Sequence, residues 1–178
     1  QDQAPEGTII QAEGANTMDI SRSVLMHKNP RERIDAATFG TMGVGLAQAI
    51  AAQVVHPDRK VICVEGDSAF GFSGMEVETA CRYRLPIVFV IINNNGIGIG
   101  FEELPEDRFQ ASAMAYTIEA GYEKMIEGFG GKGYSVRTPQ ELSSSLKQAL
   151  GDSMPSIINV HIDPQARAKP QKHHWLTA

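Results

Sequence analysis

Two side chains with oxygen donors stand near the ends of one stretch, residues 66–96, GDSAFGFSGMEVETACRYRLPIVFVIINNNG. Asp67 directly follows the apolar run KVICVEG, and Asn94, 27 positions later, lies just past PIVFVII, after Asn93. Both runs are typical of buried strands, and neighbouring parallel strands end at the same edge of a sheet. We therefore expect Asp67 and Asn94 to lie together. With a nearby backbone carbonyl they would form an oxygen-only set that suits Mg²⁺ and phosphate oxygens.

Small residues around Asp67 favour an anionic ligand beside that metal. Glycine and serine let backbone N–H groups approach phosphate oxygens closely, and the members of this set are Gly66, Ser68, Gly71 and Gly74. The helix expected over residues 73–83 would add its N-terminal dipole. The stretch therefore predicts a site for Mg²⁺ with a diphosphate. Taken alone, an Asp after a strand is more often a cap or turn residue, and Asn-Asn-Asn-Gly is most often a turn.

Other catalytic motifs are incomplete in this sequence. Ser68 is followed by Ala-Phe, so the G-x-S-x-G nucleophile elbow fails. GVGLAQ at 43–48 lacks the third glycine of a dinucleotide fingerprint, and no G-x-x-x-x-G-K-[ST] occurs. His173 and His174 lie in a polar tail without a partner at metal-ligand spacing.

Strand-like and helix-like segments alternate along the chain. Continuous apolar runs or β-branched residues predict strands over residues 8–11, 60–66, 85–92, 133–138 and 155–162. Helical spacing predicts helices over residues 17–27, capped by Asn16 or Thr17, and over 46–55, 73–83, 122–131 and 139–150. This alternation predicts an α/β fold, a doubly wound and mostly parallel sheet with helices on both faces.

Composition sets further bounds. The 178 residues suffice for one domain, and 42% apolar with 21% charged residues is ordinary for a globular protein. The net charge of −5 argues against a nucleic-acid surface, and no apolar run approaches membrane-spanning length. QDQAPEGTII has no signal-peptide pattern and is typical of a linker within a longer chain. Cys63 and Cys81 are expected to be buried free thiols.

The spacing of GDS and Asn94 around a helix and a strand resembles the motif of thiamin-diphosphate-dependent enzymes. EGANTMDISR, IDAATFGTMGVG, VICVEGDSAFGFSGMEVETACRY, NNNGI, FGGKGY and HWLT extend the likeness to the 2-hydroxyacyl-CoA lyase family, close to oxalyl-CoA decarboxylase. The resemblance implies that residues 1–178 are the C-terminal diphosphate-binding domain of a larger chain, with an irregular tail over 163–178. It also implies the thiamin-diphosphate-binding fold.

The resemblance assigns roles to individual residues. Asp67, Asn94 and the Gly96 carbonyl would bind Mg²⁺. Met42 would wedge between the two rings of thiamin diphosphate, and the Gly40 carbonyl would accept a hydrogen bond from its amino group. Other residues would lie along the cofactor or its diphosphate, namely Asn16, Gly66, Ser68, Ala69, Asn94, Gly96 and Ile97. Arg22 matches a position near the coenzyme A nucleotide of the substrate.

The implied reaction cleaves 2-hydroxyacyl-CoA to formyl-CoA and an aldehyde one carbon shorter. The cofactor-activating glutamate of the family lies in the N-terminal domain of a neighbouring subunit, so this chain alone is expected to be inactive and the whole enzyme to be a homodimer or homotetramer. Gly98 stands where relatives carry tyrosine, which affects substrate preference, and the glycines up to Glu103 are expected to loosen a lid-like loop.

Three readings remain open from the sequence. The first is the lyase, and the second is an oxalyl-CoA decarboxylase or acetolactate-synthase-like enzyme. The third is a non-catalytic assembly domain that retains only the fold. The resemblance implies a peroxisome if the source is eukaryotic and the cytoplasm otherwise, although the chain ends Leu-Thr-Ala rather than in a Ser-Lys-Leu-like signal.

Overall fold

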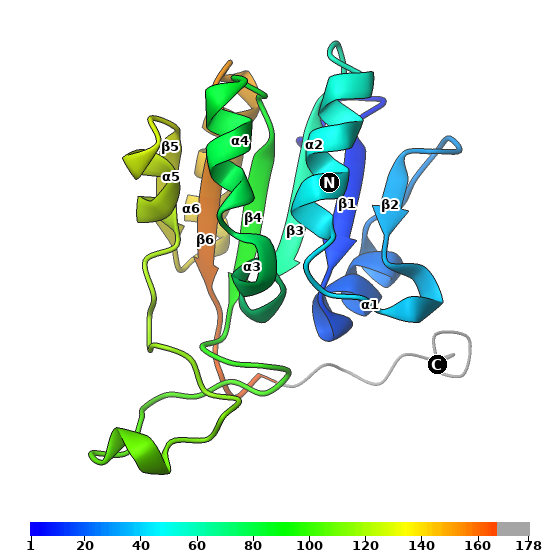
Figure 1. The fold of residues 1–178 in the computed structure, drawn as a ribbon. Coiled ribbons are helices and arrows are strands. Elements are labelled where there is room, and N and C mark those ends of the chain that lie inside the picture. Colours follow the sequence, from blue (N-terminus) through cyan, green and yellow to red (C-terminus); the bar gives the residue numbers. More distant parts are fainter. Residues whose placement is uncertain (167–178) are drawn as a thin grey trace.

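We describe the protein from a computed structural model, which covers residues 1–166. Over this part of the chain six parallel strands form one sheet in the order β2-β1-β3-β4-β6-β5 (Figure 1). The strands are β1 (Ile9–Glu13), β2 (Arg33–Asp35), β3 (Val61–Gly66), β4 (Val88–Asn93), β5 (Lys132–Val136) and β6 (Ser156–His161). The predicted doubly wound α/β fold is confirmed.

Helices cover both faces of the sheet. They are α1 (Ala15–Val24), α2 (Gly45–Val55), α3 (Asp67–Ser73), α4 (Glu76–Arg82), α5 (Glu123–Gly128) and α6 (Pro139–Gly151), with short 3₁₀ turns at Ala37–Phe39 and Arg108–Gln110. Figure 1 shows α2, α4 and α5 in front of the sheet and α6 behind it. A Thr138–Glu141 capping box and Pro139 in the first turn begin α6.

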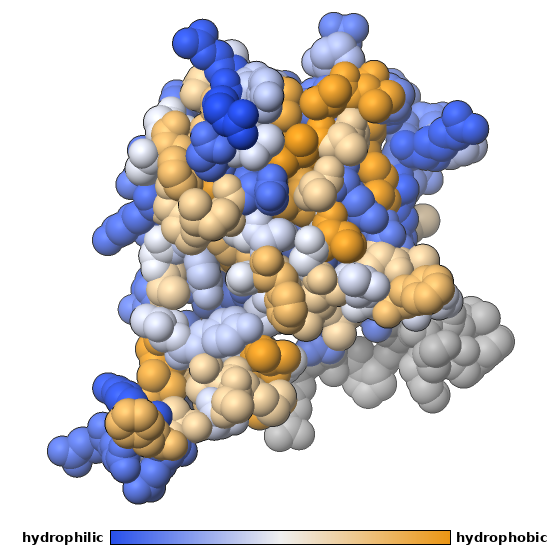
Figure 2. Space-filling model, in the orientation of Figure 1, coloured by the Kyte–Doolittle hydropathy of each residue, from blue (hydrophilic) through white to orange (hydrophobic). Residues whose placement is uncertain are grey.

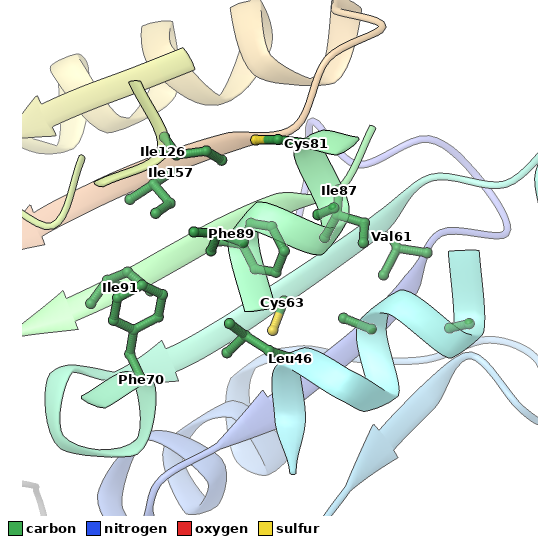
Figure 3. Close-up of a cluster of buried hydrophobic side chains, with 14 of the residues drawn as sticks. Leu46, Val61, Cys63, Phe70, Cys81, Ile87, Phe89, Ile91, Ile126 and Ile157 are labelled. Carbon is green, nitrogen blue, oxygen red and sulfur yellow. The ribbon is translucent and has the colours of Figure 1, made fainter. Parts of the chain in front are cut away.

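Apolar side chains fill the space between the sheet and the front helices. Leu46, Phe70, Phe89 and Ile157 belong to this buried cluster, and Figure 3 shows them converging from α2, α3, β4 and β6. A second cluster on the opposite face packs Val90 and Ile158 against α6. Strands β3, β4 and β6 are thus buried on both faces, which explains their continuous apolar sequences.

Both cysteines are buried free thiols, as expected. Burial raises the pKa of the Cys63 thiol well above its ordinary value, and the Glu65 carboxyl raises it further. The Cys63 Sγ donates to Gln11 Oε1 over 3.0 Å and to Glu65 Oε1 over 3.2 Å. Cys63 therefore serves as a small buried side chain with polar neighbours.

Several predicted element bounds were wrong. Helix α1 begins directly after Gly14, whose φ of +97° turns the chain, so Asn16 and Thr17 lie inside the first turn and do not cap the helix. The helix expected over 73–83 corresponds to α4, and the helix before it, α3, which begins at Asp67 itself, was not predicted. Strand β2 was not predicted, because its three residues include a single apolar one. Most of the predicted tail, from residue 167 onward and including His173 and His174, lies outside the described residues.

Large apolar side chains remain exposed on and near α2. Val54 and Val55 at the end of α2 are 62% and 69% exposed, and Phe39, Phe72 and Met75 are also exposed. Figure 2 shows apolar surface gathered over α2 on this face. Among the described residues, no helix combines the length and apolar character that a membrane crossing requires.

Candidate functional site

Strands β3 and β4 end level with each other, which brings the two predicted oxygen donors together. The register pairs Gly66 of β3 with Ile92 of β4, so Asp67 and Asn94 both emerge just past this edge. The Gly96 N–H lies 3.1 Å from Asp67 Oδ2 and 3.3 Å from Asn94 Oδ1. The expectation that Asp67 and Asn94 meet is therefore confirmed.

Asp67 is a buried carboxyl group, 2% exposed, at the start of α3. Burial raises its pKa, while backbone N–H groups of Ser68 and of residues 94–96 act in the opposite direction. Its Oδ1 accepts from Ser68 N over 2.8 Å. A carboxyl group that burial destabilises in its charged form gains from a cation placed beside it.

A cavity of about 570 Å³ opens beside Asp67, within the usual range for small-molecule sites. It runs from the ends of β3 and β4 along the face that α1 and α6 cover, where its lining is mostly apolar. Eight of the predicted site residues line it, namely Asn16, Met42, Gly66, Asp67, Ser68, Asn94, Gly96 and Ile97. The structure therefore places residues from four separate segments around one space.

Several other predicted residues lie away from this cavity. Gly40 is exposed in a left-handed turn, with φ +57°, and Ala69 is fully buried beneath Gly14. Gly71 and Gly74 lie further along, because α3 begins at Asp67 and carries them past the sheet edge. The structure therefore does not support the expectation that the Gly71 and Gly74 N–H groups approach the same anion.

Arg22 also lies outside the cavity lining. Its Nη2 lies 3.0 Å from Asp35 Oδ1, and its Nε lies 3.2 Å from Oδ2 of the same carboxylate. A further contact joins Arg22 to Asp19. The guanidinium is thus held between α1 and the end of β2.

Asn16 has a hydrogen-bond partner within the chain, on the loop after β4. It lines the cavity, but its Nδ2 donates to the Gly98 carbonyl over 3.0 Å. Gly98 has φ +75°, where an L side chain is strained. Asn16 therefore joins the start of α1 to the loop after β4.

The loop over residues 94–121 is anchored at Asn95, which lies in the turn-like sequence Asn-Asn-Asn-Gly. Asn95 has φ +66°; its Nδ2 donates to the Phe101 carbonyl over 2.9 Å, and its Oδ1 accepts from Glu119 N over 2.8 Å. Asn93 in turn contacts Asn159 and the Ala120 carbonyl. The base of the loop is therefore fixed at both ends, and the expected looseness does not extend to it.

Sequence reasoning also missed cavity residues that are small or locally unremarkable. Gly14 and Thr17 line the cavity, and a side chain added at Gly66 would meet Thr17 Oγ1 at 3.2 Å. The signal that could have found them is the position of EGANT directly after a buried strand, which places it at the same sheet edge as GDS.

Comparison with known proteins identifies the family. Residues 12–160 match the model of the C-terminal TPP binding domain of thiamine pyrophosphate enzymes. The chain belongs to this family. It is 53% identical over 99% of its length to human 2-hydroxyacyl-CoA lyase 1, and 45% identical over 86% of its length to oxalyl-CoA decarboxylase of Escherichia coli K12. The resemblance predicted from the sequence is thereby confirmed.

A solved structure shows the same arrangement of elements. The thiamine diphosphate-dependent 4-hydroxybenzoylformate decarboxylase of Rhodococcus jostii RHA1 superposes with a TM-score of 0.76 and 25% identity, over 94% of this chain and 31% of that one. The chain spans about a third of the length of the curated relatives it matches. It therefore corresponds to the cofactor-binding domain within such enzymes.

The donor set at the sheet edge fits the family's cofactor. One carboxylate and one carboxamide are hard oxygen donors, and the adjoining cavity accommodates a small molecule. In residues 1–166 no cluster of three or more His, Cys, Asp or Glu side chains forms an alternative metal site. These observations favour an oxygen-ligated cation that completes its coordination with ligand oxygens.

Proposed function

We propose that this chain binds thiamin diphosphate and Mg²⁺ within an enzyme that cleaves 2-hydroxyacyl-CoA to formyl-CoA and an aldehyde one carbon shorter. The observation that carries the proposal is the convergence of Asp67 Oδ2 and Asn94 Oδ1 on Gly96 N at the mouth of the cavity. Sequence identity of 50–54% to 2-hydroxyacyl-CoA lyases supports 2-hydroxyacyl-CoA as the substrate class.

In this proposal Asp67, Asn94 and the Gly96 carbonyl hold Mg²⁺, which neutralises the diphosphate. Ser68 and Ile97, on either side of these ligands, lie along the diphosphate, and Asn16 reaches it from the start of α1 while it also holds the Gly98 carbonyl. When bound, thiamin diphosphate supplies the thiazolium carbon and electron sink for carbon–carbon cleavage.

Met42 would position the cofactor within the same cavity. It is half-buried and lines the same space as Gly66 and Ser68. The deeper lining, which includes Ile62 and Val90, is apolar and would exclude water from the reacting groups. Gly40 would contribute only if its turn moves toward the cavity on binding, since it does not line the cavity here.

The rest of the enzyme would cover the exposed apolar surface around α2. The exposed side chains of this surface are Val54, Val55, Phe39, Phe72 and Met75. Charged residues are depleted and apolar residues enriched where proteins pack together. We therefore expect this face to contact the pyrimidine-binding domain of a neighbouring subunit in a homodimer or homotetramer.

An oxalyl-CoA decarboxylase is the second candidate, because this chain is also 45% identical to that enzyme over 86% of its length. The two activities differ in their products. Incubation of the intact parent protein with 2-hydroxyacyl-CoA and with oxalyl-CoA separates them, since the first reaction releases an aldehyde and the second releases CO₂.

The deciding experiment is calorimetric titration of thiamin diphosphate with Mg²⁺ into the intact parent protein and its Asp67→Ala variant. We expect saturable binding that falls at least a hundredfold in the variant, because a carboxylate ligand to the metal is lost. Asp58→Ala is the matched control, since Asp58 is exposed and does not line the cavity.

Unchanged affinity in Asp67→Ala would remove Asp67 from the metal site. Absence of binding by the unmodified parent protein would overturn the cofactor proposal and favour a non-catalytic assembly domain.

A further inference from the structure

The turn that carries Met42 has no cap of its own. Helix α2 begins at Gly45, and the residue before it, Val44, has no side-chain oxygen to accept the first N–H groups. Such groups at a helix start require partners from elsewhere. The turn therefore depends on another element for its conformation.

Glu13, at the end of β1, supplies those partners. Its Oε1 accepts from Gly43 N, and its Oε2 accepts from Val44 N over 3.0 Å and from Gly45 N. Glu13 is 1% exposed, so these bonds form away from solvent. A carboxylate bonded to three successive N–H groups at a helix N-terminus is favoured both by hydrogen bonding and by the helix dipole.

The turn fits this carboxylate only because of its glycines. A Cβ on Gly45 would lie 2.6 Å from Glu13 Oε2 and 2.0 Å from Glu65 Oε1. Gly43 has φ +91°, and a Cβ there would lie 2.9 Å from the Phe72 Cβ. The backbone therefore packs directly over buried carboxyl groups, which leaves little freedom for Met42.

We propose that Glu13 is a positioning residue that sets Met42 against the cofactor cavity. Glu13 is followed directly by Gly14, Ala15 and Asn16, which line the cavity, and the turn it holds carries Met42, which lines the same cavity. One buried carboxylate thus connects two segments of the cavity lining. This inference rests on the proposed function, since the ligand that Met42 would contact is thiamin diphosphate.

Glu65 offers a matched control. Like Glu13, it is a buried glutamate of the sheet, and it lies in β3. Its Oε1 contacts Cys63 Sγ, and among the described hydrogen bonds it accepts none from the N–H groups of the turn. Glu65→Gln therefore tests the effect of altering a buried carboxyl group near the turn without removing the turn's own partner.

The experiment uses the intact parent protein with Glu13→Ala, Glu13→Gln and Glu65→Gln. Hydrogen exchange is measured without cofactor on peptides covering residues 41–48, and thiamin diphosphate with Mg²⁺ is then titrated into each protein. We expect turn exchange to rise at least tenfold in Glu13→Ala and less in Glu13→Gln, which retains an oxygen acceptor. The dissociation constant should rise in the same order, and Glu65→Gln should match the unmodified protein in both measurements.

Turn exchange unchanged in folded Glu13→Gln and Glu13→Ala would overturn the proposal. So would faster turn exchange with unaltered cofactor affinity, or equal effects from Glu65→Gln. If Glu13→Ala does not fold, Glu13→Gln, which preserves side-chain volume, decides the result. Failure of the unmodified protein to bind thiamin diphosphate would instead overturn the proposed function, and the turn exchange would still show whether Glu13 holds the turn.

Discussion

Arg22 and Asp35 form a partly buried ion pair whose effect depends on pH. Burial raises the pKa of Asp35, but the hydrogen bonds from Arg22, Ala37 and Arg33 outweigh it and lower the pKa to about 2. A carboxyl group with a depressed pKa stabilises the fold above its unfolded value of 3.8, and this contribution is lost as pH falls toward 2.

We therefore predict that Arg22→Ala lowers the free energy of unfolding at pH 7 by up to about 2 kcal/mol. The loss should shrink as the pH is lowered from 4 toward 2. The thermal unfolding midpoint of the intact protein across this range measures it. Arg82→Ala is the control, because Arg82 and Glu78 form an exposed pair that solvent screens, so its loss should change the free energy of unfolding little. An equal effect of both substitutions would contradict the prediction.

The substrate role expected for Arg22 stays a prediction. A substrate phosphate would compete with Asp35 for the same guanidinium.

At the scale of elements, the loop after β4 depends on Asn95. Asn95→Ala removes the bonds to the Phe101 carbonyl and Glu119 N and places alanine at φ +66°. Left-handed backbone costs an L residue roughly 1–2 kcal/mol, and each buried partner left unpaired costs about 1–3 kcal/mol. We predict at least tenfold faster hydrogen exchange over residues 115–120 in Asn95→Ala.

Asn95→Gly separates the two contributions. Glycine tolerates the left-handed conformation but restores neither hydrogen bond, so exchange should be intermediate between the unmodified protein and Asn95→Ala. If the glycine variant exchanges as fast as the alanine variant, backbone strain plays no part. If both match the unmodified protein, Asn95 does not anchor the loop.

The sequence predicts elements well where burial leaves a continuous apolar run. PIVFVII and PSIINVHI correspond to β4 and β6, and knowing that both β3 and β4 end at one sheet edge was enough to predict the meeting of Asp67 with Asn94. β2 escaped prediction because an edge strand of three residues has no such run.

The polar supports of the site could not be predicted from local sequence. Glu13 bonds residues 30 to 32 positions away, and Asn95 reaches 24 positions to Glu119. A buried glutamate is as hydrophilic in the sequence as an exposed one, so only the tertiary fold distinguishes them. The position of α3 could not be predicted either. Because α3 begins at Asp67, Gly71 and Gly74 lie away from the cavity.

At the scale of the whole molecule, the exposed apolar surface on α2 predicts assembly. We expect the double substitution Val54→Lys and Val55→Lys in the intact parent protein to weaken its oligomer, because charges are costly in a packed interface. Light scattering coupled to size-exclusion chromatography measures the mass over a range of concentrations. Phe109→Lys is the control, since Phe109 is fully exposed on the loop after β4. An unchanged oligomer in the double variant would show that this surface stays free.

The order of strands in the sheet also governs how the chain can fold during synthesis. β4, the apolar strand VFVIIN, pairs on one side with β3, which precedes it, and on the other with β6, which is made more than sixty residues later. At translation rates of about 5–20 residues per second, the edge of β4 that pairs with β6 remains unpaired for roughly 3–12 seconds. β5 also stays unpaired until then, because within residues 1–166 it pairs only with β6. If synthesis stops before residue 156, the released chain would thus have an incomplete sheet in which one edge of the apolar strand β4 is unpaired. Such an edge can pair with other chains, so chaperones and proteases would be expected to act on this product.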